Sequence, residues 1–174
     1  MRDADIPPDR VCDPLGKRFP GLGRDPERTP MQWDASAQAG FSSNPHTWLP
    51  VTSDYPGVNV ASESADSDSL LNWYRRLIAL RRSNAALRGG RMVMLDDTNT
   101  RVLTFARVAA DGTAVLVSLN MSPTRQTVSL ALAPAGLRGG QLTTLLSSPA
   151  AIAAGGAERP LTLPPYAAWV AALR

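Results

Sequence analysis

Cysteine and histidine are almost absent from this 174-residue chain, which has only Cys12 and His46. A single cysteine excludes an internal disulfide and any metal site built from several cysteines. A single histidine excludes a histidine pair as metal ligands, and we interpret His46, beside Trp48, as a hydrogen-bonded loop residue rather than a catalytic base. We therefore expect neither a metal nor a cofactor.

Long apolar runs and two common functional motifs are missing as well. No apolar stretch reaches 18 residues, which excludes a membrane-spanning helix, and the first ten residues, MRDADIPPDR, contain no apolar core of a signal peptide. We therefore expect a cytoplasmic location and no membrane partner. The Gly16–Arg18 segment lacks the upstream glycine and the Ser/Thr of a phosphate-binding loop, and no GxSxG nucleophile motif occurs.

Chain length and net charge exclude further folds and partners. The chain is too short for a complete (β/α)₈ barrel, which needs roughly 250 residues. Its net charge of +3 is small, and its one cationic cluster lies in a single predicted helix: Arg75, Arg76, Arg81, Arg82 and Arg88. A phosphate-binding stripe is one reading, but a solvated helix face near a helix C-terminus is the favoured one. We expect no nucleic-acid partner.

The clearest element is a helix over residues 67–87. Its apolar residues repeat at helical spacing and form one stripe: Leu70, Leu71, Tyr74, Leu77 and Ile78. Asp and Ser residues at 66–68 favour the helix start, and Gly89-Gly90 favours its end. Such a stripe must pack against something, so an isolated chain is expected to self-associate through it.

Beyond residue 90 the apolar pattern changes to period two. Six segments read as short strands: Arg91–Asp96, Arg101–Val108, Ala114–Asn120, Thr127–Leu132, Gln141–Leu146 and Tyr166–Leu173. Asp111-Gly112 lies between two of them and predicts a hairpin. Short strands at this spacing predict an antiparallel β-sandwich over residues 91–174. Its four acids fall in predicted loops or at the last residue of a predicted strand, so this region offers no catalytic cluster.

Residues 1–66 are rich in Pro, Gly, Asp and Ser and have almost no periodicity. A segment of this kind is typical of surface loops on a larger scaffold. Its acids include the candidates Asp13, Asp25, Glu27 and Asp34. Two carboxylates about 5 to 9 Å apart could perform glycosidic acid–base chemistry, but the favoured interpretation is exposed loop acids paired with neighbouring arginines.

One motif is specific. The segment Gly23–Asp34 reads GRDPERTPMQWD, and it is preceded by DPLGKRF at Asp13–Phe19. It is followed in order by AGFS, WLPV, Asn59-Val60 and the helix sequence SLLNWYRRLIALR. This order resembles the α-glucosidase and oligo-1,6-glucosidase branch of the α-amylase superfamily (glycoside hydrolase family 13), from about residue 5 to residue 90.

The resemblance implies an α+β fragment. Residues 1–88 would be the tail of a (β/α)₈ barrel, made of loops plus the last helix at about 67–87, and residues 91–174 the family's antiparallel β-sandwich C-terminal domain. The family performs retaining α-glucoside hydrolysis or transfer with an Asp nucleophile, a Glu acid/base and a second stabilising Asp. None of the three segments that carry those carboxylates has a match here. We therefore expect no catalytic residue in this chain and no turnover by the isolated chain.

One functional residue can be transferred from the family. Arg24 matches the arginine that binds the non-reducing glucose, so the resemblance implies a substrate-binding role for Arg24 in a complete barrel. Residues near it are expected to support the site or pack: Asp25, Arg28, Gln32 and Trp33. The alternative for Arg24 is an ordinary surface ion pair with Asp25 or Glu27, and Trp33 next to an extended segment is more typical of core than of a sugar platform.

A second function class remains open. A free-standing β-sandwich module could bind carbohydrate or a protein partner without catalysis. It would need an exposed aromatic platform, and the aromatics available after residue 90 are Phe105, Tyr166 and Trp169. All three fit strand interiors, which argues against this reading.

Overall fold

The computed structural model describes residues 5–149, 152 and 155–174. The expectation drawn from the first ten residues therefore falls partly outside the described residues. The chain forms two compact units, Met1–Tyr74 and Arg75–Arg174, which are described separately below. In the described part of the chain, no helix is both long and apolar enough to cross a membrane.

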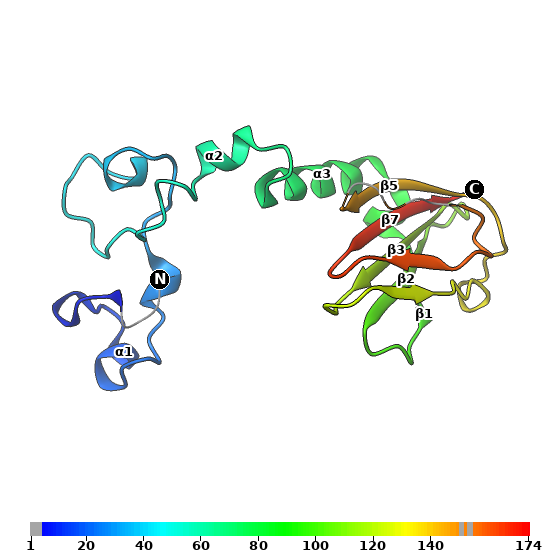
Figure 1. Ribbon diagram of the computed structural model, residues 1–174, viewed down its shortest axis with the longest axis horizontal. Helices are drawn as coiled ribbons and strands as arrows, with labels where there is room; N and C mark the ends of the chain where they lie inside the picture. Colours follow the sequence, from blue (N-terminus) through cyan, green and yellow to red (C-terminus); the bar gives the residue numbers. More distant parts are fainter. Residues whose placement is uncertain (1–4, 150–151, 153–154) are drawn as a thin grey trace. The chain divides into compact units, whose positions relative to one another are not determined.

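The second unit contains an antiparallel five-stranded sheet in the order β1-β2-β3-β7-β5. Figure 1 shows β1 and β5 at its two edges. The strands are β1 (Arg91–Asp96), β2 (Val102–Val108), β3 (Ala114–Asn120), β5 (Leu142–Ser148) and β7 (Ala168–Leu173). A second, two-stranded sheet pairs β4 (Gln126–Val128) with β6 (Leu161–Leu163). The predicted Asp111-Gly112 hairpin is confirmed: it joins β2 to β3, and Gly112 takes the left-handed backbone that this turn requires.

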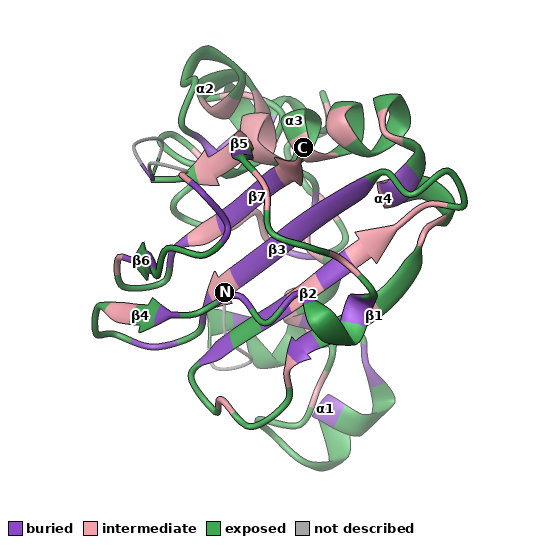
Figure 2. Ribbon diagram, turned by 90° about the vertical axis from the view of Figure 1, so that its right-hand side faces the viewer, coloured by how far each residue is buried: buried purple, intermediate pink, exposed green. Residues whose placement is uncertain are grey.

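The main core lies between the two sheets. It combines residues of the large sheet, such as Leu116 and the fully buried Trp169, with residues of the second layer, such as Leu130 and Leu163. Figure 2 shows that β3 is buried along almost its whole length. Both faces of β3 are covered because one faces this core and the other, through Val115 and Val117, faces helical residues. The predicted barrel tail followed by an antiparallel β-sandwich is confirmed at this level.

The predicted helix over 67–87 is wrong in its bounds. The structure has α3 (Leu70–Ser83) and a separate α4 (Ala85–Gly89). The chain leaves the helical conformation at Asn84, whose side chain accepts a hydrogen bond from the Leu87 amide and so caps α4. This break turns Ala86 onto the sheet, where it is fully buried against Val115 and Val117.

Two strand predictions also need correction. The predicted strand Thr127–Leu132 is only β4 (Gln126–Val128), although Leu130 and Leu132 beyond it are still buried in the core. Sequence analysis missed β6, because the prolines at 160 and 164 on either side of it obscure the strand pattern. The other strands differ from prediction by no more than two residues at each end.

The first unit has little regular structure, as predicted. Its described residues include the short helices α1 (Pro14–Arg18) and α2 (Val60–Ala65) and the beginning of α3. They also include the 3₁₀ turns η2 (Pro8–Arg10), η3 (Asp25–Arg28) and η4 (Ala37–Gly40). Several of its buried side chains are polar, including Asp13, Asp25 and Asn59. Asn59 begins α2 with a capping box: its side chain accepts from the Ser62 amide, and the Ser62 hydroxyl accepts from the Asn59 amide. The described part of this unit therefore combines polar clamps with a few buried apolar side chains, such as Leu49.

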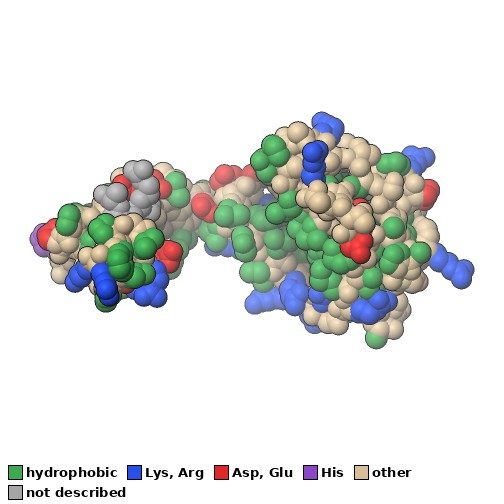
Figure 3. All heavy atoms as spheres, turned by 90° about the horizontal axis from the view of Figure 1, so that it is seen from below, with side chains coloured by type: hydrophobic (Ala, Val, Ile, Leu, Met, Phe, Trp, Pro, Cys, Tyr) green, Lys and Arg blue, Asp and Glu red, His purple; other side chains and the backbone are tan. Residues whose placement is uncertain are grey.

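Both units expose large apolar side chains (Figure 3). Along α3 no residue is buried, and the predicted stripe includes Leu70, Tyr74 and Ile78, which are 64%, 57% and 49% exposed. A further group lies on β1, on β2 and after β3: Met92, Met94, Leu103 and Met121.

Candidate functional site

Arg24, the predicted sugar-binding residue, stands immediately before the η3 turn and is held by one carboxylate. A single oxygen of Asp13, Oδ2, accepts hydrogen bonds from the Arg24 amide at 2.9 Å and from Arg24 Nε at 3.0 Å. The side chain of Asp13 is completely buried, whereas that of Arg24 is 58% exposed. The ion pair therefore has one fixed, enclosed end and one end that reaches the surface.

The partner of Arg24 differs from both residues expected for a simple surface ion pair. Neither Asp25 nor Glu27 forms that pair; Asp13 does, eleven residues upstream. Glu27 acts on Arg24 only through space, by adding to the rise in the arginine's pKa. The upstream DPLGKRF segment was part of the family resemblance, but its first residue gave no signal that it would bind Arg24.

Asp13 is fixed by further contacts. Its Oδ1 accepts a hydrogen bond from the Leu15 amide at 3.0 Å and so caps the N-terminus of α1. The side-chain hydrogen bond from Arg24, helped by the amides of Leu15 and Arg24, holds the pKa of Asp13 well below its usual range. The same hydrogen bond to Asp13 raises the pKa of Arg24. Asp13 is therefore an anion near neutral pH and cannot serve as a general acid there.

Asp25 forms the second half of the same clamp. Its buried carboxylate accepts hydrogen bonds from the Cys12 amide at 2.6 Å and from the Asp13 amide at 2.9 Å. Each carboxylate thus binds the chain segment that carries the other. The expectation that the loop acids are exposed is wrong for Asp13 and Asp25, because both are buried and occupied by amide donors.

A close backbone approach completes the loop. A side chain at Gly16 would place its Cβ 3.1 Å from the Cα of Gly23, so any larger residue at position 16 would crowd the backbone just before Arg24. Together with the two carboxylates, this contact closes residues 12–25 into one small, internally bonded loop.

The other expected site residues lie apart from the Arg24 side chain. Gln32 Nε2 donates to the Val58 carbonyl at 2.7 Å and to Asp54 Oδ1 at 3.3 Å, so it ties the motif to the segment before α2. Trp33 is half exposed rather than part of a core, and Arg28 is exposed at the end of η3. Among the described residues, no hydrogen bond or ion pair joins Arg28, Gln32 or Trp33 to Arg24.

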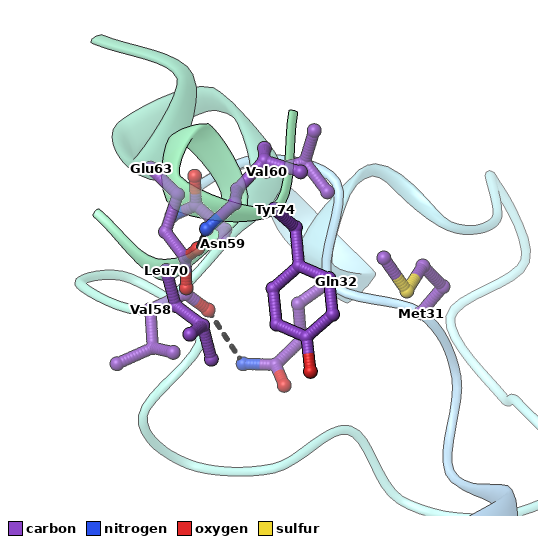
Figure 4. A pocket seen from close by; sticks show the side chains of 9 residues that line it. Met31, Gln32, Val58, Asn59, Val60, Glu63, Leu70 and Tyr74 are labelled. Carbon is purple, nitrogen blue, oxygen red and sulfur yellow. Dashed lines mark hydrogen bonds between the residues drawn. The ribbon is translucent and has the colours of Figure 1, made fainter. Parts of the chain in front are cut away.

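A mostly apolar pocket of about 470 Å³ lies next to Gln32 (Figure 4). Its lining comes from the Met31–Gln32 segment, the start of α2 and the first turns of α3, and includes Val58, Leu70 and Tyr74. Glu63 also lines it, and its carboxylate accepts a hydrogen bond from the Leu71 amide at 2.9 Å. The chemistry of this pocket suits packing against apolar protein surface.

Other candidate groups offer no reactive arrangement. His46 is exposed in a loop, and its amide donates to Asn44 Oδ1. No group of three His, Cys, Asp or Glu side chains within the described residues could hold a metal ion. The aromatic residues of the sheet unit make no platform either: Trp169 is buried and Phe105 is half-buried. Tyr166 corrects the expectation of a strand interior, since it precedes β7 and is 69% exposed.

Comparisons with known proteins agree with the motif and the fold. The family model "Alpha amylase, catalytic domain" matches residues 9–90, and "Maltogenic Amylase, C-terminal domain" matches residues 92–170. An α-glucosidase of Apis mellifera is 36% identical over 138 residues, 75% of this chain and 24% of the relative. An α-glucosidase of Pediococcus pentosaceus is 34% identical over 158 residues, 88% of this chain and 25% of the relative.

A solved structure matches as well. The trehalulose synthase of Pseudomonas mesoacidophila MX-45 superposes with a TM-score of 0.75 at 34% identity, over 92% of this chain and 28% of that one. The chain spans about a quarter of the length of the curated relatives it matches.

Proposed function

Because the chain belongs to the α-amylase superfamily (glycoside hydrolase family 13), with the sequence and fold of the C-terminal part of an α-glucosidase-like enzyme, we propose that it serves retaining α-glucoside hydrolysis or transfer. Its contribution is the Arg24 sugar-binding loop and the C-terminal sheet domain. The α-glucoside is its substrate only in the context of a complete barrel.

The observation that carries this proposal is the asymmetry of the Arg24–Asp13 pair. Asp13 binds the Nε side of the guanidinium from a buried position, and the side chain of Arg24 stays 58% exposed. In the described part of the chain the two terminal nitrogens of Arg24 make no hydrogen bond. A planar guanidinium with free donors suits the vicinal hydroxyls of a glucose ring, because it can donate to two oxygens at once.

The catalytic carboxylates, in contrast, are assigned to polypeptide other than this chain. Retaining hydrolysis needs one carboxylate as nucleophile and a second as acid/base, about 5 to 5.5 Å apart on either side of the scissile bond. Nothing in this sequence resembles the family segments that supply them, and the two buried acids of the Arg24 loop are occupied by amide donors. The isolated chain is therefore inactive, and any active enzyme needs both carboxylates from further polypeptide.

A chimaeric enzyme tests the assignment of Arg24. This chain replaces the matching part of the Pediococcus pentosaceus α-glucosidase, and hydrolysis of p-nitrophenyl α-glucoside is measured. Arg24→Ala lowers kcat/KM roughly tenfold to a hundredfold, the usual effect of losing a charged hydrogen-bond donor to substrate. Arg18→Ala, which removes an exposed arginine of α1, is the matched control and changes little. Equal activity of the two variants would refute the role of Arg24.

The alternative function, a free-standing β-sandwich that binds carbohydrate or protein, would need a platform of several exposed aromatic residues. Among the described residues after 90, Tyr166 is the one exposed aromatic, so the sheet unit does not support this alternative. A cytoplasmic location stays a prediction.

A further inference from the structure

We propose that Asp13 is the positioning residue of Arg24: it fixes the guanidinium so that both terminal nitrogens are presented ready for a sugar. The proposal rests on the proposed function of Arg24, and it assigns no contact between Asp13 and substrate. Its basis is the way in which one buried oxygen holds two separate points of the same arginine.

The hydrogen bonds between Asp13 and Arg24 restrict the conformation of the arginine side chain. Asp13 Oδ2 accepts from the backbone amide of Arg24 and from its Nε, which are separated by the whole aliphatic part of the side chain. Binding both to one oxygen closes a ring through Cα, Cβ, Cγ and Cδ, and this ring restricts the side-chain torsions that set the direction of the guanidinium. A free arginine would have to lose that rotational freedom when it bound a ligand.

The carboxylate of Asp13 is itself held in place by burial and by hydrogen bonds. Asp13 is fully buried, its other oxygen caps α1, and its amide donates to Asp25. Asp25 therefore holds Asp13, and Asp13 holds Arg24. Because Asp13 is bonded both to backbone amides and to Arg24 Nε, the loop backbone determines where the guanidinium lies.

Two carboxylates near Arg24 allow positioning to be distinguished from charge neutralisation. Glu27 also lies close enough to Arg24 to favour its charged form, yet it makes no hydrogen bond to it among the described residues. Loss of Glu27 should therefore leave the orientation of Arg24 unchanged, whereas loss of Asp13 should release it. The chain thus offers a matched pair of carboxylates, one bonded to Arg24 and one only near it.

The test is ¹⁵N NMR of the full chain, observing the Nε–H signal of Arg24 and its exchange with water. The signal is assigned by its loss in Arg24→Lys. In the wild type, exchange should be at least about tenfold slower than at Arg18, because the proton is bonded to a buried carboxylate. Asp13→Asn should bring exchange to the Arg18 rate, and Glu27→Gln should leave it slow. Fast exchange in the wild type, or slow exchange in Asp13→Asn, would overturn the proposal.

A second measurement needs no variant at Asp13 and so stays valid if Asp13→Asn fails to fold. The carboxyl ¹³C signal of Asp13 is titrated in the wild type and in Arg24→Gln. The pKa of Asp13 should lie below the ordinary 3.8 in the wild type and move toward it in Arg24→Gln, which removes the leading cause of the shift. An unchanged titration would contradict the pairing. Neither measurement uses sugar. If both show the Asp13–Arg24 hydrogen bond but Arg24→Ala leaves the activity of the chimaeric enzyme unchanged, the proposed function is refuted and the positioning of Arg24 by Asp13 still stands.

Discussion

The indole Nε1 of Trp169 donates a hydrogen bond to Thr144 Oγ1 at 3.0 Å and so joins β7 to its neighbour β5. Trp169 is fully buried in the main core, and the Thr144 hydroxyl in turn donates to the Ile152 carbonyl at 3.2 Å. A buried indole N–H has few alternatives to such a partner, which explains why a polar threonine occupies a position on the inner side of β5.

Thr144→Val should therefore destabilise the sheet unit although valine fits a strand. The substitution keeps the shape but leaves the indole N–H unpaired, at a cost of about 1–3 kcal/mol in the free energy of unfolding. Thr143→Val, on the exposed side of the same strand, is the control and should change stability little. Urea denaturation followed by circular dichroism measures both, and equal stabilities of the two variants would contradict the role of this hydrogen bond.

Asp96 should make the sheet unit sensitive to acid. Hydrogen bonds from the Thr98 hydroxyl, first, and from the Thr98 amide lower its pKa in the folded chain. The unfolded chain then binds a proton at higher pH, so the stabilisation is complete above the ordinary pKa of 3.8 and is lost as the pH falls through the folded pKa. Asp96→Asn should be less stable than wild type at pH 7, with the difference shrinking below pH 4. Asp97→Asn removes the neighbouring exposed acid, which accepts none of these hydrogen bonds, and is the charge-matched control.

We also propose that the isolated chain self-associates through the α3 stripe, with a second copy as the occupant. Leu70, Tyr74 and Ile78 are exposed, whereas Leu80 on another side of the helix packs toward the sheet. An apolar surface on the order of some hundreds of Å² is a typical association site, and burying it at roughly 25 cal/mol per Å² favours a dimer by several kcal/mol.

Sedimentation velocity of the wild type and of a Leu70→Glu, Ile78→Glu double variant tests this proposal. The wild type should sediment as dimers or larger species at micromolar concentration, and the variant as a monomer. Ala79→Glu with Ser83→Glu adds the same charge to exposed positions outside the stripe and should behave as the wild type does. A wild type that stays monomeric at high concentration would refute the proposal.

A double-mutant cycle in the chimaeric enzyme should show Asp13 acting through Arg24. Asp13→Asn alone should lower kcat/KM by an amount comparable to Arg24→Ala, roughly tenfold or more. In the Arg24→Ala background the same substitution should have little further effect, because the group that it positions is already gone. Additive losses would instead assign Asp13 an independent role in stability.

Sequence reasoning recovered most of the sheet unit, because its strands alternate strongly and are bounded by turn residues. Strands β1 and β3 begin and end where the alternation does, at Arg91–Asp96 and Ala114–Asn120. It failed where local pattern and tertiary packing disagree. The helix break at Asn84 lies inside an unbroken helical pattern, and it exists because the chain must turn there to bury Ala86 on the sheet.

The candidate site was only partly predictable. The motif identified Arg24, but the partner of an arginine cannot be read from spacing when Asp13, Asp25 and Glu27 are all within reach along the chain. Asp13 becomes the partner of Arg24 because the backbone at Gly16 packs closely against Gly23 and because backbone amides donate hydrogen bonds to the carboxylates of Asp13 and Asp25. These are contacts between segments, and no local pattern encodes them.

Hydrolysis of p-nitrophenyl α-glucoside by the purified 174-residue chain is the measurement that tests the proposed function most directly. We expect no turnover above buffer, because in the proposed function Arg24 binds sugar and the two carboxylates that retaining hydrolysis requires come from other polypeptide. Activity that co-purifies with the chain and disappears in Asp25→Asn or Asp34→Asn would contradict it, since these acids would then perform the chemistry assigned to other polypeptide.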